Sequence, residues 1–325
     1  MTDSDELLAI RAAELYYDDD KTQDEIGTLL RLTRWKVGRL LAQAKARGFI
    51  RIEIVHPRAR KLQLERALRE RFGLADAIVI PVADARDDEE IQARCAQAAA
   101  DYLASRRPAP RVLGVSWGRT LHEVAQRLPS GWAPHVDVVQ INGGVSLNKR
   151  AGMAESTAVA IARKANGTVR LLPSPAILER VETKRSIERD RAVAGVLNFA
   201  RTASVYLYSA GVVTEDSAHV DSGYLTPSDI EALKRKGAVG DVVGRYINAA
   251  GEIVDSELDQ RTLGLSLDQL RRAATGIAVI AGRPKHEIAR AVVTNGLCTV
   301  LVTDEATALT LLAELDPSPS QPHQQ

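Results

Sequence analysis

Apolar residues recur at helical spacing in two short segments between residues 22 and 46. The first segment carries three of them on one predicted face: Ile26, Leu29 and Leu30. Thr22 precedes Glu25 by three residues, which is the spacing of a reciprocal helix N-terminal cap. The second segment follows Thr33, a suitable N-cap, and its apolar positions are Val37, Leu40, Leu41 and Ala44. The tight turn between the segments predicts a helix-turn-helix.

Further elements are predicted on both sides of this pair. The N-terminal segment is expected to form a helix that contributes the rest of a small core: Leu7, Leu8, Ile10, Ala12, Leu15 and Tyr16. Arg47-Gly48 is typical of a helix end, and residues 49–54 then alternate between apolar and charged, which predicts a short strand or wing. Residues 1–56 are therefore predicted to form a winged helix-turn-helix domain.

The remainder of the chain shows a different pattern, in which short β-branched runs alternate with alanine-rich helical stretches. The predicted strands lie at residues 77–82, 111–115, 136–142, 168–173, 204–211, 277–282 and 299–303. Continuous apolar strands separated by helices predict a doubly wound, mostly parallel sheet covered on both faces, an α/β domain over residues 74–316. Such sheets bind ligands at the carboxyl ends of their strands.

Two connecting segments complete the predicted domain organisation. Residues 58–72 carry a short apolar stripe among many charges and end at Gly73, so residues 57–73 are predicted to form a linker helix. This helix either pairs subunits or serves only as a connector. The last residues, 317–325, are rich in Pro, Ser and Gln and are expected to be disordered.

Charge is distributed unevenly along a chain of 325 residues whose net charge is only +1. Residues 31–60 hold nine Lys or Arg and a single acid, Glu53, whereas the first thirty residues are mainly acidic. A local basic patch on a helix-turn-helix is typical of salt-dependent DNA binding. No apolar run is long enough to span a membrane and the acidic N-terminus is unlike a signal peptide, so we expect a cytoplasmic protein. Cys95 and Cys298 are isolated, and neither a disulfide framework, a metal site nor a cofactor is expected.

The face of the second helix opposite its apolar stripe carries Trp35, Arg39, Ala42 and Ala46. Such a face fits the DNA major groove. The candidate DNA contacts are Thr22, Gln23, Thr33, Arg34, Trp35, Lys36 and Arg39. Arg39 can contact a guanine, whereas Arg34 and Lys36 can equally hold phosphates. The alternative is a solvated helical hairpin with surface arginines.

Glycine and polar residues follow several of the predicted strands. One such loop comprises Ser116, Trp117, Gly118, Arg119 and Thr120, at a helix N-terminus where free backbone N–H groups suit phosphate or sugar hydroxyls. Ordinary turn chemistry explains that glycine equally well. Other candidate effector contacts at strand ends are Asn142, Gly143, Gly144, Gly211 and Lys285. Asp241 can accept hydrogen bonds from sugar hydroxyls, and Arg245 is expected to pair with Asp241 structurally.

An enzyme is the competing interpretation. Residues 114–118 match the G-x-S-x-G pattern of a hydrolase nucleophile elbow, with Ser116 as nucleophile and His219 or His286 as its base. A glycine-rich oxyanion loop is missing from the preceding strand end. An isomerase acting on a sugar phosphate needs a carboxylate beside the substrate carbonyl, and residues 143–153 contain no acid.

Taken together, the helix-turn-helix and the motifs GVSWGRTL, INGG, GAVGDVVGR and AGRPKHEIARAVVTNG resemble the SorC/DeoR family of sugar-responsive bacterial transcription regulators. The resemblance covers residues 7–315. It implies an effector domain similar to sugar-phosphate isomerases but without their activity, assembly into a homo-oligomer (dimer or tetramer), and a sugar, polyol or sugar phosphate as effector. It further implies ligand contacts from the residues 116–120 loop, the Asn142 turn, Asp241 and Lys285.

Two residues depart from the family pattern. Some relatives have lysine or arginine at the position of Asn142, and small residues at the position of Trp117. Asparagine forms neither an imine nor a charged phosphate contact, so an unphosphorylated sugar or polyol stays an alternative. The sequence thus predicts an operator-binding regulator of a carbohydrate or polyol catabolic operon.

Overall fold

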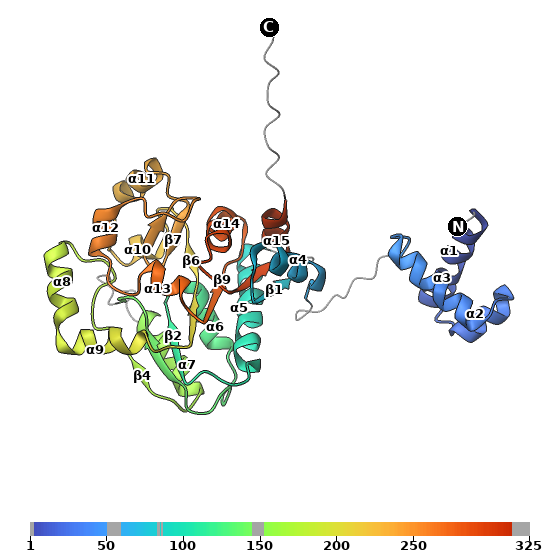
Figure 1. Cartoon of the computed structure of the whole chain (residues 1–325), viewed down its shortest axis with the longest axis horizontal. Coiled ribbons are helices and arrows are strands. Elements are labelled where there is room, and N and C mark those ends of the chain that lie inside the picture. The colour runs from blue at the N-terminus through green and yellow to red at the C-terminus, as the bar shows by residue number, and fades with distance from the viewer. Residues whose placement is uncertain (1–2, 51–59, 83–84, 86, 145–152, 314–325) are drawn as a thin grey trace, which may run out of the picture. The chain divides into compact units, whose positions relative to one another are not determined.

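The computed structural model describes residues 3–50, 60–82, 85, 87–144 and 153–313, and its contacts divide the chain into two compact units, Met1–His56 and Pro57–Gln325 (Figure 1). Each unit has a hydrophobic core of its own. The predicted wing beyond residue 50 and the predicted disordered tail lie outside the described residues.

The first unit contains three helices, α1 (Asp3–Tyr17), α2 (Gln23–Leu30) and α3 (Arg34–Ala46). The reciprocal cap predicted at Thr22 and Glu25 is present, with the Thr22 N–H 2.8 Å from the Glu25 carboxylate. Thr33 caps α3 through the Lys36 N–H. Gly27 lies within α2 and faces the turn, so that a Cβ atom there would come within 2.7 Å of the Leu32 carbonyl oxygen. The helix-turn-helix is therefore formed as its sequence predicts.

The predicted inner face of α1 is partly wrong. Alanines contribute most of it, and the buried residues of the helix are Ala9, Ala12, Ala13 and Leu15. Leu7, Ile10 and Tyr16 are instead exposed, as is Leu29 of α2. Small side chains let α1 approach α3 closely, so the larger apolar residues are left on the outside.

The second unit is built on a parallel sheet of seven strands in the order β1-β10-β9-β5-β2-β3-β4. The strands are β1 (Asp76–Ile80), β2 (Val112–Val115), β3 (Asp137–Gln140), β4 (Val169–Arg170), β5 (Val205–Tyr208), β9 (Thr275–Val279) and β10 (Val300–Asp304). Each of the seven predicted runs overlaps one of these strands, and the bounds of β1, β9 and β10 extend one or two residues beyond their runs. This confirms the predicted α/β class.

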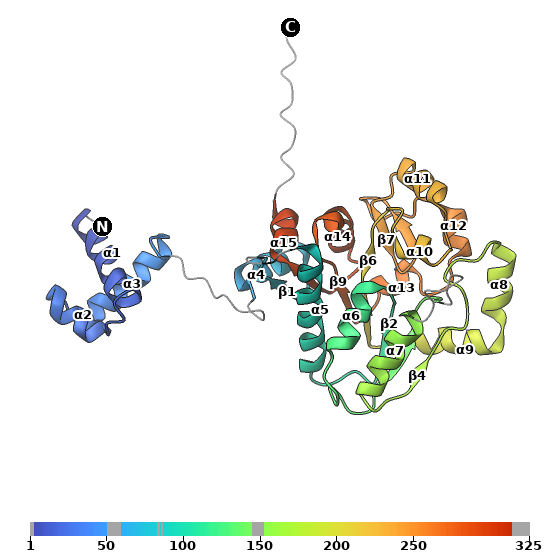
Figure 2. The ribbon, with the colours of Figure 1, turned by 180° about the vertical axis from the view of Figure 1, so that it is seen from behind.

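Helices cover both faces of this sheet. One face packs against α5 (Asp88–Ser105), α6 (Arg119–Arg127) and α7 (Met153–Lys164), which lie side by side in Figure 2. The other face carries α4 (Leu62–Phe72), α9 (Arg191–Ala200), α13 (Leu267–Arg271), α14 (His286–Thr294) and α15 (Glu305–Leu312). Of the helices that the structure describes, none combines the length and apolar character that crossing a membrane requires.

A smaller antiparallel sheet, not predicted from the sequence, follows β5. It consists of β6 (Ala210–Gly211), β7 (Gly240–Val242) and β8 (Arg245–Ile247). Val243 and Gly244 both have positive φ and form the two-residue turn between β7 and β8, the geometry that suits strand twist in a hairpin. Four short helices complete this part of the unit: α8 (Val181–Arg189), α10 (Ala218–Asp221), α11 (Pro227–Arg235) and α12 (Ser256–Arg261). Strands of two or three residues are too short for a periodicity argument.

The helix predicted over residues 58–72 begins at Leu62 and packs against β1 and α15 within the second unit. Residues in the first turn of this helix and just before it satisfy the free edge of β1. Glu65, only 4% exposed, accepts a 2.9 Å hydrogen bond from the Val79 N–H and pairs with Arg60. The Lys61 N–H donates to the Val79 carbonyl at 2.8 Å. The helix therefore caps an edge strand whose backbone would otherwise be exposed.

Candidate functional site

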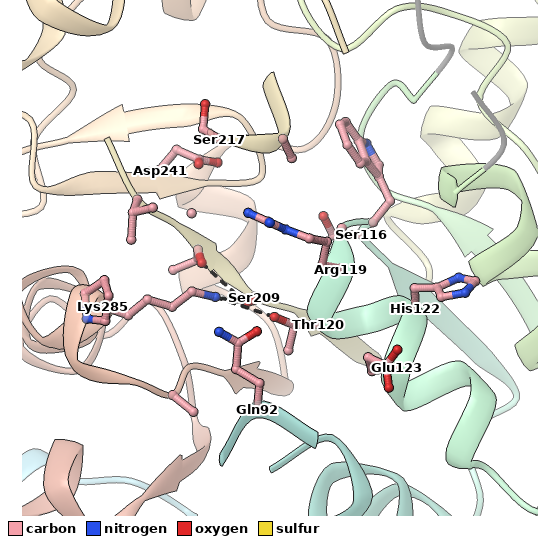
Figure 3. A pocket seen from close by; sticks show the side chains of 18 of the residues that line it. Gln92, Ser116, Arg119, Thr120, His122, Glu123, Ser209, Ser217, Asp241 and Lys285 are labelled. Atoms are coloured by element: carbon pink, nitrogen blue, oxygen red, sulfur yellow. Dashed lines mark hydrogen bonds between the residues drawn. The ribbon is translucent and has the colours of Figure 1, made fainter. Parts of the chain in front are cut away.

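A cavity of about 1060 Å³ lies at the carboxyl ends of the central strands (Figure 3). It occupies the point where the chain order of the sheet reverses, because β2 leads outward to β3 while β5 leads toward β9 on the other side. Parallel pairing aligns the ends of β2, β3, β5 and β9, so the residues that follow them meet at one edge. Doubly wound sheets bind ligands in this crevice.

The loop after β2 supplies the N-terminus of α6 to the cavity. Ser116, Trp117, Gly118, Arg119 and Thr120 all line it, as predicted from their position in the chain. Gly118 has a φ of 134° with open space where a Cβ would lie, and no side chain caps the helix. The first backbone bond of α6 is made by the His122 N–H. In the described part of the chain the N–H groups of residues 118–121 have no backbone partner, so they can meet an anion or hydroxyl.

Lys285 lies between two other strand ends. Its Nζ is 3.3 Å from the Ser209 hydroxyl after β5 and 3.5 Å from the Thr120 hydroxyl on α6 (Figure 3). The hydrogen bond from the Gly282 N–H to Asp304 fixes the loop that carries it. Burial lowers the pKa of the Lys285 ammonium to about 8, opposed by the Asp241 carboxylate and aided by Arg119. In the described part of the chain no carboxylate lies within 4.0 Å of this ammonium, so a ligand anion fits beside it.

Asp241 forms the opposite wall of the cavity and is 7% exposed. One carboxylate oxygen accepts a 2.9 Å bond from the Gly244 N–H, and the other lies 3.9 Å from Nδ1 of His219. Gly211 pairs with Asp241 across β6 and β7, and a Cβ on Gly211 would come within 2.0 Å of that carboxylate. The glycine at position 211 thus makes room for Asp241, and an acceptor of hydroxyl protons faces the cavity.

The expected pairing of Arg245 with Asp241 is wrong. Arg245 is buried and its guanidinium bonds with the Asp259 carboxylate and, at 2.8 Å, with the Leu265 carbonyl. The prediction relied on the closeness of Asp241 and Arg245 in the sequence. Asp241 is opposite Tyr246 in the hairpin, and Arg245, the residue before Tyr246, points to the other face. Asp241 is therefore available to a ligand.

Trp117 is held in place by the protein itself. Its indole N–H donates a 2.7 Å hydrogen bond to the Gly143 carbonyl, and its ring contacts His219 and Tyr224 edge-on at 6.0 and 6.3 Å. Gly143 and Gly144 do not line the cavity. The Gly144 N–H instead bonds to Ser174, and a Cβ on Gly143 would come within 2.2 Å of the Pro175 carbonyl. Asn142 does line the cavity and is 2% exposed.

Sequence reasoning missed several lining residues. Ser209 follows β5 directly, so its position at a strand end was a usable signal. Gln92, His122, Glu123 and Asp216 also line the cavity, from α5, α6 and a loop. No local pattern distinguishes Gln92, His122 and Glu123 from other helix-surface residues, and it is the packing of α5 against α6 that brings Gln92 beside the other two.

The geometry offers little support for a serine hydrolase. Ser116 and His219 line the same cavity, but among the residues described no hydrogen bond joins them. His219 Nδ1 lies instead 3.0 Å from the Tyr246 hydroxyl. His286 contacts Thr310 on α15 and does not line the cavity. The second half of a catalytic triad is therefore not assembled around Ser116.

A second candidate surface lies on α3 of the first unit. Val37, Leu40, Leu41 and Ala44 face the core, and Trp35, Arg39, Ala42 and Ala46 face solvent, as the helical spacing predicts. Gln23, the first residue of α2, lies against Gly38 of α3. The Thr22 hydroxyl already donates to Glu25, whereas the Thr33 hydroxyl accepts the Lys36 N–H and keeps its own proton for another partner.

Several basic residues of this unit have acidic partners within it. Arg34 lies 3.5 Å from Asp24 and Lys36 lies 3.8 Å from Asp5, while Arg47 bonds with Glu6. The acidic N-terminal residues thus partly neutralise the basic patch. Arg39 is exposed and has no ion pair among the residues that the structure describes.

Comparison with known proteins agrees with this arrangement. A family model described as "Putative sugar-binding domain" matches residues 56–313. The chain is similar to the deoxyribonucleoside regulator of Bacillus subtilis, with 30% identity over 95% of this chain and 98% of that protein. It is also similar to the transcriptional regulator LsrR of an Enterobacter strain, with 32% identity over 95% of this chain and 94% of that protein.

Solved structures give the same result. A DeoR family transcriptional regulator from Listeria monocytogenes has a TM-score of 0.71 and 28% identity, over 77% of this chain and 98% of that one. The full-length sorbitol operon regulator SorC from Klebsiella pneumoniae has a TM-score of 0.69 and 25% identity, over 95% of this chain and all of that one, 100%.

Proposed function

Because the chain belongs to the SorC/DeoR family of sugar-binding transcriptional regulators, we propose that it binds operator DNA through α3. Its affinity for the operator falls or rises when a carbohydrate effector binds the second unit. The regulated genes encode carbohydrate or polyol catabolism. DNA-binding proteins of this kind work in the cytoplasm, which is where we place this one.

The observation that carries the effector proposal is the position of Lys285 beside the free N-terminus of α6. The ammonium contacts two hydroxyl groups and, in the described part of the chain, has no carboxylate within 4.0 Å. Next to the N-terminal backbone N–H groups of α6, it suits a phosphate or other anionic group. Asp241, on the opposite wall, suits the hydroxyls of the same molecule. We therefore propose a sugar phosphate as effector, held by Ser116, Gly118, Arg119, Thr120 and Lys285 at its anionic end.

We also propose that the protein acts as a homo-oligomer, a dimer or a tetramer, so that two helix-turn-helix units contact a roughly palindromic operator. Symmetric assemblies present identical surfaces to two half-sites about one DNA turn apart. Light scattering of the full chain gives the mass, and a monomer at micromolar concentration that still protects a palindromic site would contradict this part of the proposal.

The effector class is tested by thermal unfolding of the full chain with sugars, polyols and their phosphates, since a ligand that binds only the folded state raises the melting temperature. Hits are then added to complexes with the protein's own promoter region. We expect a sugar phosphate to raise the melting temperature and to change DNA affinity. Stabilisation by the free sugar alone would favour the unphosphorylated alternative.

The same proposal expects no turnover, in line with relatives that are named as regulators. Incubation with sugar phosphates and with an ester substrate checks this. Turnover that Ser116→Ala abolishes would support the hydrolase and overturn the assignment.

A further inference from the structure

Trp35 is the most exposed large hydrophobic side chain in the described part of the chain, at 89%. The other two tryptophans are enclosed in the second unit, where Trp132 is 4% exposed and Trp117 is held by Gly143. Trp35 occupies the first turn of α3, and among residues 3–50 its indole belongs to no hydrophobic cluster. The exposed position of Trp35 differs from the enclosed position expected of a tryptophan that stabilises the fold.

The residues around Trp35 indicate which side chains of α3 are available for contact with DNA bases. Arg34 and Lys36, on either side, have Asp24 and Asp5 as intramolecular partners. Arg39 lies one turn further along the same face and is exposed. Ala42 and Ala46 then continue the face with single methyl groups, which project much less from the helix than the indole of Trp35. Two side chains, one apolar and one cationic, therefore stand out for contact with base edges.

The chemistry of the major groove offers one partner for each. The thymine C5-methyl group is the apolar feature there, and the O6 and N7 atoms of guanine accept a pair of hydrogen bonds from arginine. Residues four apart are separated by about 6 Å along a helix, which is less than two base-pair steps of about 3.4 Å. The two base pairs contacted are thus adjacent or separated by one.

We propose that Trp35 is a specificity-determining residue that packs against a thymine methyl group in each operator half-site, with the guanine of Arg39 one or two base pairs away. This inference rests on the proposed function and adds the base chemistry that α3 reads. The indole makes the contact with its ring, since a methyl group offers no hydrogen bond.

The test combines protein and DNA changes. Footprinting of the full chain on its own promoter region delimits a duplex, and each thymine of that duplex is replaced in turn by deoxyuridine, which lacks only the methyl group. For the unmodified protein we expect one position per half-site to weaken binding about fourfold, the effect of burying one methyl group. For Trp35→Ala we expect thymine and uracil at that position to bind equally.

Leu29→Ala is the matched control, because Leu29 is also apolar and 57% exposed in the same unit but lies on α2. It is expected to keep the thymine-to-uracil difference, and circular dichroism checks that both variants fold. The proposal is overturned if Trp35→Ala still binds thymine more tightly than uracil at that position. It is also overturned if the thymine whose methyl group matters lies far from every guanine whose replacement by the 7-deaza analogue weakens binding. A protein with no preference for its promoter over random duplex would instead overturn the proposed function itself.

Discussion

Arg34 on α3 and Lys285 before α14 both carry a charge that we assign to an anionic partner, but their surroundings differ. Arg34 is 67% exposed, pairs with Asp24 at 3.5 Å, and exchanges one carboxylate for water or phosphate at little cost. Lys285 is half-buried, and in the described part of the chain its hydrogen-bond partners are two hydroxyl groups. The exposed charges of the first unit thus form weak ion pairs that salt screens. In the second unit the charges are more buried, so their removal has larger effects on stability and ligand binding.

The largest expected effect concerns Glu65, which is buried beneath the start of α4. Glu65→Ala leaves the Val79 N–H without its acceptor and Arg60 without its partner. We expect the second unit to lose about 3 kcal/mol of unfolding free energy, measured by urea denaturation. Glu70→Ala is the control, since the exposed Arg66–Glu70 pair contributes no more than about 0.5 kcal/mol. Equal losses in both variants would break the comparison between buried and exposed charges.

Lys285→Met comes next, because it removes the cation but keeps an unbranched apolar stem. We expect effector affinity, followed by thermal shift or calorimetry, to fall about 30-fold, the value of a charged hydrogen bond of about 2 kcal/mol. DNA affinity without effector should not change. Arg283→Ala is the matched control, since Arg283 is exposed and does not line the cavity. An unaltered effector response in Lys285→Met would place the anion site elsewhere.

The low pKa of Lys285 adds a pH dependence. An ammonium with a pKa of about 8 is mostly protonated at pH 7 and mostly neutral at pH 9. Affinity for a sugar phosphate should therefore fall about tenfold between these values, while affinity for a neutral polyol should not. Without ligand, this group makes the protein more stable as pH rises from about 8 toward 10.5, because the unfolded chain then binds the extra proton. Calorimetry at both pH values with each ligand class decides between the two effectors.

The smallest expected effect lies in the first unit. Asp24→Asn releases Arg34 from its acidic partner, so DNA affinity at low salt should rise about threefold, within the range of an exposed ion pair. Asp18→Asn removes the same charge from a residue that has no ion pair in the described part of the chain. A gain of equal size in Asp18→Asn would mean that net charge, rather than the Arg34 pair, limits binding.

Local sequence determined much of the architecture. The cap at Thr22 and Glu25, the cap at Thr33 and the outward face of α3 follow from interactions within three or four residues, so they could be predicted. The inner strands of the parallel sheet were equally visible, because a strand buried on both faces must be apolar along its length. The cap that Asp304 makes on α15 belongs to the same class.

Packing between distant segments decided the rest. The exposure of Leu7, Ile10 and Leu29 depends on how closely alanines let α1 approach α3, which periodicity alone does not reveal. Arg245 pairs with Asp259 rather than Asp241 because, in the hairpin, its side chain lies on the opposite face from Asp241.

The cavity shows both contributions together. Position at a strand end pointed to Thr120 and Lys285. Only the sheet order, in which β5 lies between β2 and β9, brings Lys285 beside Ser209, 76 residues away in the sequence, and Thr120, 165 residues away. Sequence specifies which strands are buried and which loops follow them. The order in which parallel strands pair is set by the packing of whole helices across the sheet, and that order decides which loops share a ligand.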